Sequence, residues 1–403
     1  MDAGIAVAAA RRGTKGKWMR LRPHAGISTL LTTAGVVALL MPASIAAAAG
    51  NPGAAVTAQC RATAQHEDAF HDGHSCTTLP AQPVKKWSVT LNGDASYPII
   101  ADGKVFVATA NPGGSYGGWL YALNALSGKV AWGPVPLGAT YFWFALAYGD
   151  GNVYVNNFDG TVSAYNASTG RQVWSQGTNY FSGYPVAYDG VVYVQGAGPV
   201  YALSEKTGAV LWQSSYLDGD GSAVSANATG VYVAAGCSWF RLSLATGAVI
   251  WSGNSGCSGG GGGTTYLSNG RDFETVGNFI VNASTGKTVG TFSGVPAFSG
   301  TNGYFAIGSS IFCENVKTLT PVFTAPVPST VATSPVIAGQ TLYVGASNSE
   351  VYGLSTTTGK VTWHGALPGV PGGGAQYSSP TSDIAVGNGL LVVPTGTQVT
   401  AFG

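Results

Sequence analysis

The densest group of residues that could do chemistry lies near the N-terminus, between Cys60 and Cys76. His66, His71 and His74 fall within nine residues there, with Asp and Glu residues between them. Imidazole and carboxylate groups suit zinc or copper, so a metal site in this loop is one hypothesis. A solvated loop closed by a disulfide is the other interpretation and the commoner arrangement.

Aromatic residues in Gly-rich and Ser-rich segments form a second group. Such side chains could stack on sugars, extended peptides or a quinone. The alternative is that about half of them pack against neighbouring loops at the starts of strands. The candidate ligand-binding residues are Tyr116, Tyr141, Phe142, Trp143, Tyr180, Phe181, Tyr216, Trp239, His364 and Tyr377.

A repeated pattern predicts the elements that position these residues. It consists of a Gly-containing turn, a β-rich run such as 105–107, a run ending near Tyr-Ala-Leu, and Thr-Gly followed at fixed spacing by Trp. Five copies keep the same spacing from Gly to Trp. The fifth copy has Gly290 at the Trp position, and the sixth has Phe323 near it. The tryptophans of the regular copies are Trp132, Trp174, Trp212, Trp251 and Trp363.

The eighth copy begins near Gly389 and ends at Gly403 without its Trp segment. That segment stands alone near the other end of the chain, around Lys86-Trp87. A ring in which an N-terminal strand completes the last blade accounts for both observations and removes exposed strand edges. Four short strands per repeat of about 40 residues predict an all-β, eight-bladed β-propeller.

The order Ser/Tyr-Pro, Tyr-Val, Tyr-Ala-Leu, Thr-Gly and Trp resembles the pyrroloquinoline-quinone (PQQ) type of propeller repeat. The resemblance covers about residues 85–403 and is clear in five of eight copies. This family includes quinone-dependent alcohol dehydrogenases and also non-enzymatic relatives, such as the propeller lipoprotein of the outer-membrane assembly machinery.

For the enzymes, the resemblance implies adjacent cysteines, a calcium site and a catalytic aspartate. The sequence has no Cys-Cys pair, and Thr229 stands where a calcium loop beginning at Asp218 would need Glu. We therefore expect a chain closer to the scaffold propellers, not an enzyme, and without a cofactor. The alternative is a sugar or alcohol oxidoreductase that depends on PQQ and calcium.

In such a ring, the loops between blades and the turns between second and third strands share one face, the channel mouth. The aromatic group maps to these loops, so we expect this face to bind a protein, peptide or glycan. The same mapping predicts a disulfide between Cys237 and Cys257 on this face. Cys60 and Cys76 form the second predicted disulfide, and Cys313 is expected to be a buried free thiol.

The N-terminal 49 residues have the features of a signal peptide. A basic region precedes an apolar run at 27–41 and small residues with Ala-x-Ala cleavage sites at 43–49. Translation could start at Met1 or Met19, and Arg11-Arg12 leaves twin-arginine export as an alternative. The expected parts are the signal peptide (1–49), an extension with the Cys60–Cys76 loop (50–84) and the propeller (85–403).

The low charge of the chain narrows its expected partners. The net charge is +1 and only 9% of residues are charged, so no overall field favours nucleic acid. The apolar run is too short for a comfortable membrane span. We expect a secreted monomer without an integral membrane segment in its mature form.

Overall fold

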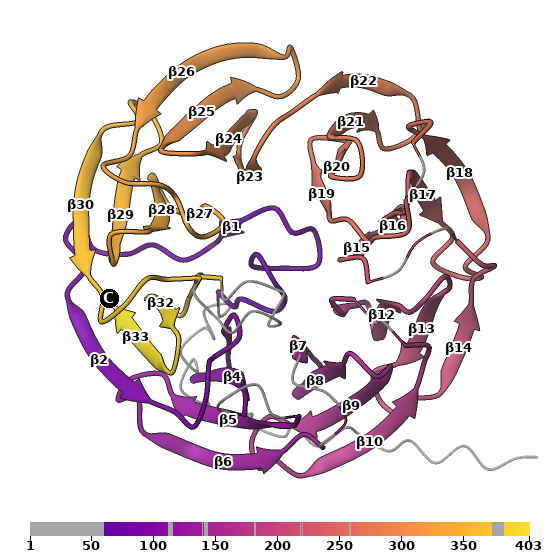
Figure 1. The fold of residues 1–403 in the computed structure, drawn as a ribbon, viewed down its shortest axis with the longest axis horizontal. Coiled ribbons are helices and arrows are strands. Elements are labelled where there is room, and N and C mark those ends of the chain that lie inside the picture. The colour runs from indigo at the N-terminus through magenta and orange to yellow at the C-terminus, as the bar shows by residue number, and fades with distance from the viewer. Residues whose placement is uncertain are drawn as a thin grey trace, which may run out of the picture. The chain divides into compact units, whose positions relative to one another are not determined.

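Consecutive antiparallel strands form eight separate sheets in the computed structural model, and the sheets follow one another around a ring (Figure 1). The structure describes residues 60–111, 116–138, 140, 144–180, 183–217, 219, 221–257, 259–372 and 383–403. All of them belong to one unit, Val56–Gly403. The predicted eight-bladed β-propeller is confirmed. The predicted signal peptide lies outside the described residues.

The first four blades each contain four strands, ordered from the ring centre outward. Blade 1 contains β3 (Ile99–Ala101), β4 (Lys104–Ala110), β5 (Gly118–Asn124) and β6 (Val130–Pro136). Blade 2 contains β7 (Phe144–Gly149), β8 (Asn152–Asn157), β9 (Thr161–Asn166) and β10 (Gln172–Gly177). Blade 3 contains β11 (Val186–Tyr188), β12 (Val191–Gln195), β13 (Val200–Ser204) and β14 (Val210–Gln213). Blade 4 contains β15 (Ser225–Asn227), β16 (Gly230–Ala235), β17 (Ser238–Leu242) and β18 (Val249–Asn254).

The remaining blades follow the same order, with two additions from the N-terminal part of the chain. Blade 5 contains β19 (Thr265–Ser268), β20 (Arg271–Glu274), β21 (Phe279–Asn282) and β22 (Thr288–Thr291). Blade 6 contains β23 (Val295–Ser299), β24 (Asn302–Ile307), β25 (Ser310–Asn315) and β26 (Thr320–Pro326). Blade 7 contains β27 (Val336–Ala338), β28 (Thr341–Ala346), β29 (Glu350–Ser355), β30 (Val361–Ala366) and the added inner strand β1 (His74–Ser75). Blade 8 contains β31 (Ala385–Gly387), β32 (Leu390–Thr395), β33 (Gln398–Phe402) and the added outer strand β2 (Lys85–Thr90).

The two ends of the described chain close the ring in blade 8. β2 pairs antiparallel with β33, and Ser88 lies opposite Thr400 in this register. The predicted closure is therefore confirmed. Because β2 covers the free edge of β33, the last blade has the same four-stranded form as the others.

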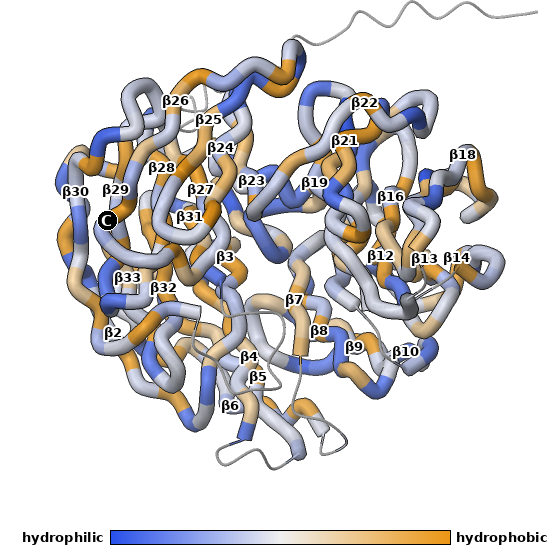
Figure 2. Tube along the Cα trace, turned by 45° about the horizontal axis from the view of Figure 1, so that its top comes forward, coloured by the Kyte–Doolittle hydropathy of each residue, from blue (hydrophilic) through white to orange (hydrophobic). Residues whose placement is uncertain are grey.

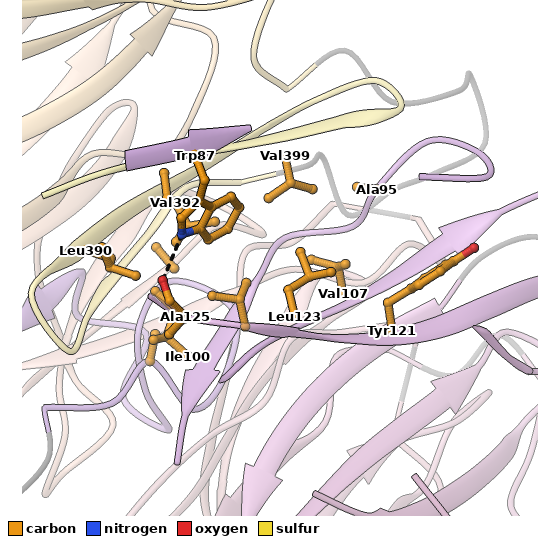
Figure 3. Close-up of a cluster of buried hydrophobic side chains, with 14 of the residues drawn as sticks. Trp87, Ala95, Ile100, Val107, Tyr121, Leu123, Ala125, Leu390, Val392 and Val399 are labelled. Atoms are coloured by element: carbon orange, nitrogen blue, oxygen red, sulfur yellow. Dashed lines mark hydrogen bonds between the residues drawn. The ribbon is translucent and has the colours of Figure 1, made fainter. Parts of the chain in front are cut away.

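Apolar clusters fill the contacts between neighbouring blades, and hydrophobic stretches recur along the strands (Figure 2). The contact between blades 8 and 1 is built around Trp87, whose indole nitrogen donates to the carbonyl of Ala125 at 2.8 Å (Figure 3). The indole ring lies on Gly128, where an added Cβ would come within 2.6 Å of the ring. Gly128 also has φ +67°, so glycine is required there both by the backbone and by the ring.

The same arrangement recurs around the ring. The indole nitrogens of Trp132, Trp174, Trp212 and Trp251 each donate to a carbonyl of the next blade. In every blade, the pairing between the third strand and the outer strand contains a register shift close to the Trp position. Such a bulge turns the ring toward the neighbouring blade. This contact explains the fixed spacing from Gly to Trp in the sequence.

Residues 60–76, here called the plug, cross the centre of the ring (Figure 1). Main-chain hydrogen bonds join the plug to the inner ends of blades 1, 2, 4, 5, 6, 7 and 8 at distances of 2.7 to 3.0 Å. All of these bonds lie next to the turns between first and second strands. The plug therefore occupies the face opposite the predicted channel mouth. Within the described residues, no helix has the length and apolar character needed to cross a bilayer.

Candidate functional site

The histidines of the plug are structural groups, and they do not come together around a shared centre. The ring nitrogens of His66 lie 2.7 Å from the carbonyl oxygen of His71 and 2.8 Å from that of Pro335. Those of His71 lie 2.7 Å from the carbonyl of Gln65 and 2.9 Å from that of Val224. Carbonyl oxygens only accept hydrogen bonds and a neutral imidazole has a single N–H, so each ring can donate to one of its two carbonyls. The two rings lie between the plug and blades 7 and 4.

The zinc or copper site suggested by the sequence is not assembled in this structure. His66 and His71 are buried, and burial lowers the pKa of both; the pKa of His71 falls to about 4. His74 is exposed in β1. Among the described residues, no group of three or more His, Cys, Asp and Glu side chains is arranged to hold a metal. Asp218 and Asp220, where the calcium loop considered in the sequence would begin, lie outside the described residues.

Two carboxyl groups lie buried where the plug meets blade 8. One oxygen of Glu67 accepts from the amide of Val386 at 2.6 Å, and one oxygen of Asp383 accepts from the amides of Ser334 and Ile384. The second oxygen of each carboxyl is buried without a hydrogen-bond partner. Burial raises the pKa of Glu67 well above its usual value and that of Asp383 to about 6. A carboxyl with a pKa of about 6, as at Asp383, can exchange protons near neutral pH.

Three exposed tyrosines mark the face opposite the plug. Tyr116 lies between β4 and β5, Tyr180 in the loop that leaves blade 2, and Tyr216 in the loop that leaves blade 3. Their exposed fractions are 58%, 64% and 74%. The structure therefore places these predicted residues on one face, along blades 1 to 3.

The turn between β12 and β13 holds two of these tyrosines in position. The amide of Ala197 donates to the carbonyl of Tyr180 at 2.7 Å, and the amide of Leu217 donates to the carbonyl of Gly198 at 3.2 Å. Gly198 has φ +96°, and an added Cβ would collide with the ring of Tyr216. Large side chains that are exposed yet anchored lose little entropy on binding, which suits them to recognition.

Two predicted ligand-binding residues lie elsewhere. Trp239 is only 3% exposed and packs on Phe279 with ring centroids 5.2 Å apart, so it belongs to the contact between blades 4 and 5. His364 is in the outer strand β30, with a 64% exposed side chain 3.5 Å from a carboxylate oxygen of Glu350. Neither lies in a channel-mouth loop. The remaining candidates, Tyr141, Phe142, Trp143, Phe181 and Tyr377, lie outside the described residues.

Both predicted disulfides are present. Cys60 pairs with Cys76 and closes the plug, and Cys237 pairs with Cys257 above blade 4. Cys313 is a buried free thiol, as expected. Its pKa is raised to about 11 by burial, which makes it a poor nucleophile.

Sequence reasoning missed several charged residues inside the ring. Asp383 and Asp272 are fully buried, and Arg241 and Arg271 line a cleft between blades 4 and 5. Asp272 and Arg241 occupy positions that are aliphatic or small in the regular repeats. A comparison of the repeats position by position would have found both substitutions, and it would also have found Asp383, which stands where blades 1 and 7 have Tyr97 and Ser334.

Comparison with known proteins identifies the family. A family model described as outer membrane protein assembly factor BamB matches residues 117–262 and again residues 241–403. Outer membrane protein assembly factor BamB of Yersinia pestis is 30% identical over 144 residues, which are 32% of this chain and 35% of that protein. Tetrathionate hydrolase of Acidithiobacillus ferrooxidans is 25% identical over 345 residues, which are 76% of this chain and 64% of that protein. The chain thus spans about a third of the first relative and just under two thirds of the second.

Solved structures share the fold at low sequence identity. A europium-containing methanol dehydrogenase has a TM-score of 0.63 and 13% identity, covering 84% of this chain and 90% of its own. The quinohemoprotein alcohol dehydrogenase from Comamonas testosteroni has a TM-score of 0.64 and 12% identity, and the match covers 85% of this chain and 80% of that one. BamB from Moraxella catarrhalis has a TM-score of 0.59 and 17% identity, and the match covers 79% of this chain and 99% of that one.

These comparisons correct one expectation. The absence of the quinone motifs from the sequence predicted a chain that is not an enzyme. A tetrathionate hydrolase matches three quarters of the chain, and the fold is shared with methanol and alcohol dehydrogenases, which overturns that expectation. The missing quinone motifs concern only PQQ-dependent oxidation, whereas one fold can host enzymes with several different reactions.

Proposed function

Because the chain belongs to the family described as outer membrane protein assembly factor BamB, we propose that it is an exported propeller that binds a protein partner on the face opposite the plug. The observation that carries the proposal is the arc of exposed tyrosines, Tyr116, Tyr180 and Tyr216, across blades 1 to 3. Tyrosine is enriched in binding surfaces because it buries a large area at low entropic cost. Two disulfides support export to an oxidising compartment.

The plug adds to this proposal. Since residues 60–76 are bonded to the inner ends of seven blades on one face, a partner has the other face as its route to the channel. The face with the tyrosines is also the one that carries the Cys237–Cys257 disulfide. We propose that the ring acts as a rigid platform and that binding needs neither PQQ nor calcium.

Site-directed photo-crosslinking in the source cells tests this proposal. A photoreactive amino acid is placed at Tyr180, at Tyr216 and, as a control, at Leu126, which is 89% exposed in a turn on the plug face. We expect the same discrete protein adduct from positions 180 and 216 and none from 126. The adduct should persist in the presence of a calcium chelator. Equal adducts from all three positions, or none from 180 and 216, would reject the surface.

Catalysis is a second candidate, favoured by the match to tetrathionate hydrolase over 345 residues. Glu67 and Asp383 are the neighbouring buried carboxyls that this candidate uses for proton transfer, because burial raises the pKa of both. Purified protein is incubated with tetrathionate, and its loss is followed by chromatography. A parallel assay adds PQQ with calcium and follows dye reduction with alcohols and sugars. Activity that disappears in Asp383→Asn would support catalysis, whereas no turnover in either assay would remove this candidate.

A further inference from the structure

A cleft on the plug face lies between blades 4 and 5, and it is distinct from the tyrosine face. Its volume is about 440 Å³, which lies in the range of sites for small ligands. Its walls include Arg241 from β17, Arg271 from β20, Tyr232 from β16 and Phe70 from the plug. The cleft thus joins a cationic lining to aromatic walls.

The cleft exists because the contact between blades 4 and 5 is poorly filled. Each pair of neighbouring blades shares one apolar cluster, and this one has three buried members, Tyr232, Leu267 and Ala283. The cluster between blades 8 and 1 has fifteen. Where regular repeats have Ala in the third strand, as at Ala122, this blade has Arg241. An arginine cannot be packed inside the blade, so its side chain extends along Tyr232 into the cleft.

The two guanidinium groups are held in place without losing their charge. Arg241 donates through Nε, at 3.0 Å, and through Nη2 to the carbonyl of Thr229, and through Nη1 to that of Ala283 at 3.4 Å. Its guanidinium carbon lies 6.0 Å from the centre of the Tyr232 ring. Arg271 donates through Nη2 to the carbonyl of Lys317 at 2.8 Å. These acceptors are neutral, so they fix the side chains but do not neutralise them.

The walls of the cleft carry no negative charge beside these two cations. Neither guanidinium forms an ion pair with a described carboxylate, and none of the described residues along the walls is acidic. Glu314 of β25, which is not part of the walls, interacts electrostatically with Arg271. The nearby carboxyl of Asp272 is fully buried, with neither oxygen hydrogen-bonded. Burial, together with the neighbouring Glu274, raises the pKa of the Asp272 carboxyl well above the usual range, which favours its uncharged form. Five donors per guanidinium leave N–H groups on both arginines for a ligand.

We propose that this cleft binds a small organic oxyanion, with its carboxylate or sulfonate group on Arg241 and Arg271 and its apolar body between Phe70 and Tyr232. Guanidinium groups recognise planar oxyanions through paired, charge-assisted hydrogen bonds. The hydroxyl of Ser268 in the cleft lining accepts from Asn269 Nδ2 and has its own hydrogen left for a further acceptor, whereas the hydroxyl of Ser284 already donates to Asn282 Oδ1. The site does not depend on the proposed function, since it uses the other face of the ring.

Titration calorimetry of the full mature chain at fixed ionic strength tests the proposal with three probes. Benzoate carries the charge and the ring, benzamide has the same shape without charge, and sulfate has the charge without the ring. We expect benzoate to bind at least tenfold more tightly than benzamide and sulfate to displace it competitively. No benzoate binding, equal affinity for benzamide, or no displacement by sulfate would overturn the proposal.

Substitutions locate the binding. Arg241→Ala restores the residue of the regular repeats, and Arg271→Asn introduces the residue found at the equivalent position 152 of blade 2. Each should weaken benzoate binding at least tenfold, while Arg171→Ala, the same loss of charge on an exposed turn of blade 2, leaves it unchanged. Unchanged affinity in both cleft variants would reject the site. If Arg241→Ala does not fold, Arg271→Asn alone decides.

Discussion

The contact between blades 8 and 1 and the contact between blades 5 and 6 solve the same packing problem with different residues. Between blades 8 and 1, the large Trp87 lies on the small Gly128. Between blades 5 and 6 the large and the small residue change places: Gly290 occupies the position of the Trp, and Leu319 occupies the position of the Gly. The two residues touch, since a Cβ added to Gly290 would lie 2.8 Å from Leu319 Cδ1. The comparison shows that the ring needs one large and one small partner at this contact, and that either blade can supply the large one.

The other contact of blade 5 is not compensated in this way. Asp272 stands where regular repeats have Val or Leu, as at Val105 and Val231, and its carboxyl finds no partner. At the contact between blades 4 and 5, an aliphatic residue of the repeat is therefore replaced by an aspartate, and no other residue restores the packing. A buried polar group without a hydrogen bond costs stability, and such departures are expected at functional sites.

The largest expected effect comes from removing the large partner of the closing contact. Trp87→Ala deletes a ring that is 7% exposed, together with its hydrogen bond to Ala125. We expect the free energy of unfolding to fall by about 3–5 kcal/mol. Equilibrium denaturation measures this change. Because β2 closes the ring, a loss below about 1 kcal/mol would show that closure does not depend on this contact.

The exchange between blades 5 and 6 can be reversed by a double substitution. Gly290→Trp alone forces a ring against Leu319 and should cost about 1–3 kcal/mol. Adding Leu319→Gly provides the small partner and also relieves the φ of +56° at this position. We therefore expect the double variant to recover most of the loss, with a coupling of about 0.5–3 kcal/mol in a double-mutant cycle. Additive effects would mean that the two positions are not partners.

At the contact between blades 4 and 5, replacing the buried Asp272 by an aliphatic residue should increase stability at neutral pH. Asp272→Val restores the aliphatic residue and should stabilise the protein by about 1–3 kcal/mol at pH 7.5. The pKa of Asp272 is raised in the folded state, so the folded chain holds a proton that the unfolded chain releases. The stability of the native protein therefore falls as pH rises above the usual aspartate pKa, and the gain should be smaller at pH 4.

Asp272→Asn separates the two causes, because it removes the titration but keeps a buried polar group. Urea denaturation at pH 4 and pH 7.5 should show a flatter pH dependence for Asn and Val than for the native chain. Only Val should be more stable throughout. Stability that falls in Asp272→Val at both pH values would mean that the carboxyl has a partner that the packing does not reveal.

Substitutions on the tyrosine face are expected to change stability least, because Tyr180 and Tyr216 take no part in the Trp–Gly contacts between blades. The double variant Tyr180→Ala with Tyr216→Ala should change the free energy of unfolding by less than about 0.5 kcal/mol, because both side chains are mostly exposed. Under the proposed function, the same variant loses capture of the crosslinked partner. A loss of stability comparable to that of Trp87→Ala would instead assign these tyrosines to packing.

The ring, the closing strand, the two disulfides and the buried thiol could all be predicted from the amino-acid sequence. These features follow from local patterns, since the spacing from Gly128 to Trp132 recurs and each copy must pack against the next. The role of the plug, in contrast, became visible only in the folded chain. His66 meets Pro335 across 269 positions of the chain, so no local spacing could distinguish its role from that of a metal ligand. The same holds for Asp272 and Arg241, because burial and the charge of a cleft arise from neighbours that the fold alone brings together.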